Sequence, residues 1–83
     1  MVDSNTIAEI KTILEGTLNR SVNFSPSTHL IDSGILDSLD SISFLFELEN
    51  KTGASIPDSV IADGHIWTVE KLANYIDENR AKN

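Results

Sequence analysis

The chain has 83 residues, of which 40% are hydrophobic, and it contains no cysteine. This length suits one small domain with a single core, and the lack of cysteine excludes disulfides and thiolate metal sites. Thirteen acidic residues against six Lys and Arg give a net charge of −7, which disfavours nucleic acid and favours basic partner surfaces. Because neither a signal-peptide pattern nor an apolar run of membrane-spanning length is present, we expect a cytoplasmic protein, and we take a monomer as the default oligomeric state.

The apolar pattern predicts a first helix over about residues 6–19. Its apolar positions recur at spacings of three and four residues, at Ile7, Ile10, Leu14 and Leu18. Thr6 and Glu9 have the spacing of a capping box, which would make Thr6 the N-cap. Residues 20–37 are rich in turn formers, yet large apolar residues interrupt them at Val22, Phe24, Leu30, Ile31 and Ile35. We therefore expect a long loop that is ordered over the core.

The second half of the chain predicts three more helices. A main helix covers about residues 38–52 with Asp37 as its N-cap, a short helix covers about 58–62, and a last helix covers about 68–79. No strand pattern and no internal repeat are present. The sequence thus predicts a single all-α domain over residues 1–83, a small antiparallel four-helix bundle with a short third helix.

The helix predicted at 38–52 has an apolar arc of roughly 220°, far wider than the stripe of about 100° that a surface helix needs. One part of the arc consists of Phe44, Leu45 and Leu48, and the other of Leu39, Ile42 and Phe46. Two explanations stay open, alone or combined. The helix is central and touches neighbours on both sides, or the second part is exposed and binds a partner.

Ser38 opens this helix directly after Asp37. From the residues alone, it is either an ordinary first-turn serine or a site of modification. A hydrolase nucleophile is not supported, because the Gly-x-Ser-x-Gly pattern is absent and both histidines, His29 and His65, lie in polar loops without an orienting partner. The carboxylates lack the spacing of a calcium loop. We expect no catalytic residue and no metal site, and thus a protein that is not an enzyme.

Three blocks of the sequence resemble the acyl carrier proteins. They are Asp37-Ser38-Leu39-Asp40-Ser41-Ile42, Leu48-Glu49 and Gly53-Ala54-Ser55-Ile56-Pro57-Asp58. That family carries Asp-Ser-Leu at the start of its second helix and Gly-x-x-Ile-Pro-Asp after it. The match covers essentially the whole chain, the first helix and long loop in pattern only. It implies a four-helix fold with a short third helix.

The resemblance also implies a carrier function without internal catalysis. Ser38 would be esterified by 4′-phosphopantetheine from coenzyme A, with Asp37 and Leu39 completing the attachment motif. The arm's thiol would hold an acyl or aminoacyl group as a thioester. The partners would be a phosphopantetheinyl transferase, a loading ligase and downstream acyl-using enzymes. The second helix would contact them through Asp40, Ile42, Phe46 and Glu47.

Departures from the fatty-acid carriers point to a particular kind of cargo. Leu30-Ile31-Asp32-Ser33-Gly34-Ile35-Leu36-Asp37-Ser38 is more similar to D-alanyl carrier proteins and to some peptidyl or specialised carriers. Polar residues also stand where fatty-acid carriers have acids, at Ser43, Asn50 and Lys51. We expect a short acyl or aminoacyl cargo in a specialised pathway. The alternatives are a general carrier of fatty acid synthesis and, in another class, an unmodified helical protein-interaction domain.

Overall fold

The computed structural model describes residues 4–80, which contain four α-helices and one short 3₁₀ helix. The helices are α1 (Ser4–Leu18), α2 (Ser38–Thr52), α3 (Asp58–Asp63) and α4 (Val69–Asn79), with η1 (His65–Trp67) before α4. In these residues the only extended pairing is an isolated bridge between His29 and Thr68. The predicted all-α four-helix fold with a short third helix is confirmed.

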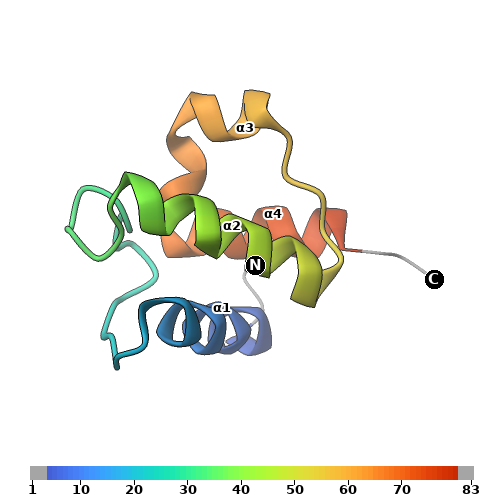
Figure 1. Cartoon of the computed structure of the whole chain (residues 1–83). Coiled ribbons are helices and arrows are strands. Elements are labelled where there is room, and N and C mark those ends of the chain that lie inside the picture. Colours follow the sequence, from blue (N-terminus) through green and yellow to red (C-terminus); the bar gives the residue numbers. More distant parts are fainter. Residues whose placement is uncertain (1–3, 81–83) are drawn as a thin grey trace.

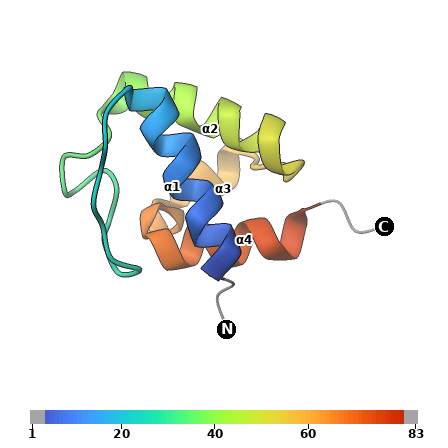
Figure 2. The same ribbon diagram turned by 90° about the horizontal axis from the view of Figure 1, so that it is seen from below.

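Figure 1 shows α2 between α1 on one side and α3 on the other. α1 runs roughly opposite to α2 in both views (Figures 1 and 2), and α4 crosses α1 steeply in Figure 2. The C-terminal end of α1 and the N-terminal end of α2 therefore lie at the same end of the bundle. Within residues 4–80, no helix is long and apolar enough to cross a membrane. Residues 1–3, part of the segment in which we find no signal-peptide pattern, lie outside the described range.

The start of α1 differs from the prediction. The helix begins at Ser4, so Thr6 lies inside it and the predicted capping box is wrong. Thr6 is buried, and its hydroxyl donates a hydrogen bond to the Asp77 carboxylate of α4. Glu9 forms an ion pair with Arg80, the residue that follows α4. Thr6 and Glu9 thus connect α1 to the C-terminal part of the chain. Each of them binds a residue distant in the sequence in place of the local partner that a capping box would provide.

The long loop is ordered over the core, as the sequence predicts. It begins one residue earlier than expected, because Asn19 adopts a left-handed backbone conformation (φ 58°) that ends α1 at Leu18. The five predicted anchors are all buried or partly buried: Val22, Phe24, Leu30, Ile31 and Ile35. Leu36, which the sequence analysis did not single out, is also buried, with 2% of its surface exposed.

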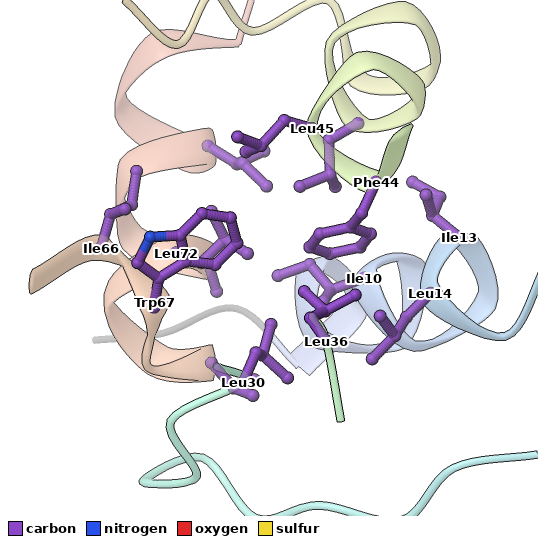
Figure 3. Packing of buried hydrophobic residues seen from close by; sticks show 14 of the residues in the cluster. Ile10, Ile13, Leu14, Leu30, Leu36, Phe44, Leu45, Ile66, Trp67 and Leu72 are labelled. Carbon is purple, nitrogen blue, oxygen red and sulfur yellow. The ribbon is translucent and has the colours of Figure 1, made fainter. Parts of the chain in front are cut away.

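α2 is both a core helix and an exposed one. Its inward residues Phe44, Leu45 and Leu48 are buried. In Figure 3, Phe44 and Leu45 point into a cluster that side chains from α1, the loop, η1 and α4 complete, among them Ile10, Leu14, Leu36, Trp67 and Leu72. Leu39, Ile42 and Phe46 remain 75%, 68% and 62% exposed. The wide apolar arc therefore has a buried part and an exposed part.

Candidate functional site

Ser38 is the first residue of α2, and its side chain is exposed. Asp37 caps the helix as predicted, because its Oδ1 accepts the backbone N–H of Asp40 at 2.7 Å. The Asp37 carbonyl accepts the N–H of Ser41 at 2.9 Å, and the Ser41 hydroxyl donates to the Ser38 carbonyl at 2.9 Å. The backbone around Ser38 is thus fixed by hydrogen bonds, while the residue itself is exposed to solvent.

The loop that leads to Ser38 is hydrogen-bonded to the segment that connects η1 to the start of α4. Three backbone hydrogen bonds make this attachment: Leu30 N–H to the Trp67 carbonyl at 2.9 Å, Val69 N–H to Thr28 at 3.1 Å, and Glu70 N–H to Pro26 at 2.8 Å. His29 Nδ1 accepts the N–H of Asp32 at 3.0 Å, so this ring stabilises the loop. A further bond joins Leu36 N–H to the Leu30 carbonyl at 2.9 Å, directly before α2. Ser38 therefore follows a loop with a defined conformation.

The start of α2 suits an anionic group on Ser38. The first N–H groups of an α-helix have no carbonyl partner within the helix, and they form the positive end of its dipole. The Asp37 side chain accepts the N–H of Asp40. The N–H groups of Ser38 and Leu39 remain without a partner inside the helix and point toward its N-terminal end. Phosphate groups are stabilised at such positions. A phosphodiester on the Ser38 oxygen therefore fits the residues present.

Leu39, Ile42 and Phe46 form an exposed apolar surface on α2, which we call the α2 strip. Their spacing of three and four residues places them on one helical face. Asp40 and Glu47 flank one side of the strip, about 100° around the helix from it. Both are half-buried, and Glu47 lies 4.0 Å from Lys51 in an ion pair. Of the residues expected to bind partners, Ile42 and Phe46 thus lie on the strip itself and Asp40 lies at its flank, while Glu47 lines the surface between α2 and α1.

A groove of about 350 Å³ lies between α2 and α3, beside the α2 strip. Ile42 and Phe46 line it from α2, and Ile56, Ile61 and Trp67 line the opposite side. The last three residues were not among the predicted site residues. No sequence pattern identifies them, since they reach α2 only through the way in which α3 and η1 fold back over it.

Comparison with known proteins gives one family match and two close relatives. Residues 8–76 match the family model described as "Phosphopantetheine attachment site". The chain is 36% identical to D-alanyl carrier protein 1 and 34% identical to D-alanyl carrier protein 2, both of Lactiplantibacillus plantarum. Each match covers 59 residues, which are 71% of this chain and 74% of the relative.

The family match spans most of the chain and ranges from α1 to α4. Carrier domains of this kind interact with the transferase that attaches their arm and with ligases that load it. They supply no catalysis of their own. This result decides against the unmodified interaction domain that the sequence left open. The chain belongs to the phosphopantetheine attachment family: it is a non-catalytic carrier protein with a covalently attached 4′-phosphopantetheine.

Proposed function

We propose that Ser38 is the attachment residue of the phosphopantetheine arm, within a motif that Asp37 and Leu39 complete. The observation that carries this proposal is the exposed Ser38 hydroxyl on a capped helix start. The nearby Ser41 is a contrasting case, because its hydroxyl already donates to the Ser38 carbonyl. In the attachment reaction, the Ser38 oxygen forms a phosphodiester bond as its proton leaves and the nucleotide part of coenzyme A departs.

Intact-protein mass spectrometry tests the attachment residue. The purified chain is incubated with coenzyme A, magnesium and a broad-specificity phosphopantetheinyl transferase, next to Ser38→Ala and Ser41→Ala. We expect a gain of one phosphopantetheine on the wild type and on Ser41→Ala, and none on Ser38→Ala. Circular dichroism checks that Ser38→Ala keeps its helical signal, as expected for an exposed side chain. Modification of a folded Ser38→Ala protein would refute the proposal.

The proposed partner surface is the α2 strip with its acidic flank. Three apolar side chains that are each more than 60% exposed on one helical face are unusual for a surface that stays solvated. Such a face typically fits an apolar groove of a partner. We assign this role to Ile42 and Phe46, with Asp40 and Glu47 contributing charge. The partners would be the transferase, the loading ligase and the downstream enzymes that use the acyl group.

The proposed cargo is an aminoacyl or short acyl group in a specialised pathway. The names of the two relatives as D-alanyl carrier proteins support this, as does the sequence from Leu30 to Ser38. Loading by an adenylating ligase supplied with ATP and D-alanine, followed by mass spectrometry, tests it. Copurification of a long acyl thioester instead would favour a general fatty acyl carrier, for which the groove between α2 and α3 is one available apolar surface. We further propose that the whole chain acts as one monomeric carrier domain in the cytoplasm.

A further inference from the structure

Arg20 is an isolated positive charge in an acidic part of the chain. Between Lys11 and Lys51 it is the only Lys or Arg residue. The same stretch contains six acidic residues, namely Glu15, Asp32, Asp37, Asp40, Glu47 and Glu49. Among the described residues, the ion pairs join Glu9 to Arg80 and Glu47 to Lys51. None of these pairs involves Arg20, so no carboxylate of residues 4–80 neutralises its guanidinium.

Hydrogen bonds fix the backbone of Arg20 and of the residues that follow it. The left-handed conformation of Asn19 turns the chain out of α1, and the Arg20 N–H then donates to the Glu15 carbonyl at 3.3 Å. Two residues later, the N–H of Val22 donates to Glu15 Oε2 at 3.0 Å. Glu15 therefore fixes the chain on both sides of Arg20, although the Arg20 side chain itself is exposed.

The guanidinium reaches toward the segment that leads into α2. Its Nη2 lies 3.5 Å from the carbonyl oxygen of Ile35, a long contact to a neutral acceptor. Ile35 precedes Ser38 by three residues, so their Cα atoms are at most about 11 Å apart. Side chains of an α-helix tilt toward its N-terminus, so the Cα–Cβ bond of Ser38, the first residue of α2, points toward the end of the helix at which this segment enters. Both ribbon views place the end of α1 and the start of α2 at the same end of the bundle (Figures 1 and 2).

We propose that Arg20 binds the phosphate of the phosphopantetheine arm. This inference rests on the proposed attachment at Ser38. The phosphodiester adds a negative charge next to Asp37 and Asp40, and a guanidinium offsets such charge while donating hydrogen bonds in a geometry that matches phosphate oxygens. A charged acceptor is a stronger partner than the Ile35 carbonyl, so Arg20 exchanges its long contact for the phosphate. The arm therefore leaves Ser38 with its phosphate held toward the end of α1.

Phosphorus NMR of the holo-protein tests this contact directly. The ³¹P chemical shift of the phosphodiester is recorded at low salt and at about 1 M NaCl, where the Debye length falls to about 3 Å. We compare the wild type with Arg20→Gln, Arg20→Lys and the control Lys11→Gln, which removes the same charge from the exposed side of α1. We expect the wild-type, Arg20→Lys and Lys11→Gln signals to move with salt. The Arg20→Gln signal should stay at the high-salt position throughout.

The result that overturns the inference is a ³¹P signal of Arg20→Gln equal to that of the wild type at low salt. An equal displacement in Arg20→Gln and Lys11→Gln would overturn it too, because net charge alone would then explain the effect. If Arg20→Gln loses its native ¹H–¹⁵N spectrum, the wild-type titration decides, and a salt-independent wild-type signal overturns the inference. Mass spectrometry separates this failure from failure of the attachment proposal: an arm present on the wild type and absent from Ser38→Ala leaves that proposal standing.

Discussion

Asp37 connects the folding of α2 with the chemistry proposed for Ser38. Its carboxylate caps the helix, and the same negative charge lies beside Ser38, the proposed attachment residue. A capping side chain contributes about 1 kcal/mol, whereas Asn caps nearly as well as Asp without the charge. Two variants at this one position therefore separate the capping function from the electrostatic one.

We predict that Asp37→Ala lowers the free energy of unfolding by about 1 kcal/mol and that Asp37→Asn changes it little, because Asn also accepts the N–H of Asp40. Urea denaturation with an unchanged m-value measures this difference. If the transferase recognises the negative charge of Asp37, both variants are modified more slowly than the wild type. If only the helix start matters, Asp37→Asn is modified at the wild-type rate. Equal stability of Asp37→Ala and the wild type would contradict the capping function.

Two of the N-terminal caps predicted from the sequence, Asp37 and Thr6, had different outcomes, and the cause is physical. Asp37 caps α2 through a partner three residues away, so the local pattern contains all the information. Thr6 has an equally good local pattern, but its hydroxyl donates to Asp77, which is 71 positions away. A local rule cannot anticipate that burial against α4 provides a competing partner. The local sequence thus predicts an N-cap correctly where no tertiary contact offers the capping side chain a competing partner.

At the scale of whole elements, α1 and α2 end in the same way. In each helix a glutamate near the C-terminus accepts a backbone N–H seven residues further on. Glu15 Oε2 accepts the N–H of Val22 at 3.0 Å, and Glu49 Oε2 accepts the N–H of Ile56 at 2.7 Å. Val22 and Ile56 are both buried. Each glutamate therefore satisfies a polar group of the backbone where the chain returns to the core.

We predict that Glu49→Ala exposes the Ile56 amide to faster hydrogen exchange and costs about 1–3 kcal/mol of stability, since a buried N–H loses its acceptor. Glu49→Gln should retain part of the protection, because its amide oxygen still accepts. Residue-resolved hydrogen exchange makes the measurement. Glu15→Ala is the matched control and should affect Val22 instead. Unaltered exchange at Ile56 in Glu49→Ala would show that the loop before α3 has another source of order.

The elements differ in how much of them the sequence predicts. The periodicity identifies α2 and its wide apolar arc, because side chains three and four residues apart share a face. It cannot decide which part of the arc is buried, since that depends on where α1 and α4 pack. The groove between α2 and α3 is even harder to predict from the sequence. Ile42 and Ile61 line it together only because α3 and η1 fold back over α2.

At the scale of the whole molecule, charge and apolar surface are distributed differently. The net charge of −7 gives a long-range field that attracts basic partners. On α2, however, Glu47 is paired with Lys51 and Glu49 accepts the N–H of Ile56. The exposed side of α2 therefore offers the α2 strip as its apolar contact surface, with the charges of Asp40 and Glu47 at its flank. We infer that charge sets the rate of encounter, and burial of the α2 strip sets the affinity once a partner has docked.

We predict that Ile42→Ser lowers kcat/KM for phosphopantetheine attachment about tenfold or more. Burying an exposed isoleucine contributes about 1.5–3 kcal/mol, and each 1.4 kcal/mol corresponds to a factor of ten. Steady-state kinetics with the transferase measure this loss, and Asn50→Ser, an exposed change in the last turn of α2, is the control. Because the field of the whole molecule is the same in each variant, added salt should slow the wild type and Ile42→Ser by equal factors. A kcat/KM for Ile42→Ser equal to that of Asn50→Ser would mean that the transferase docks elsewhere on the bundle.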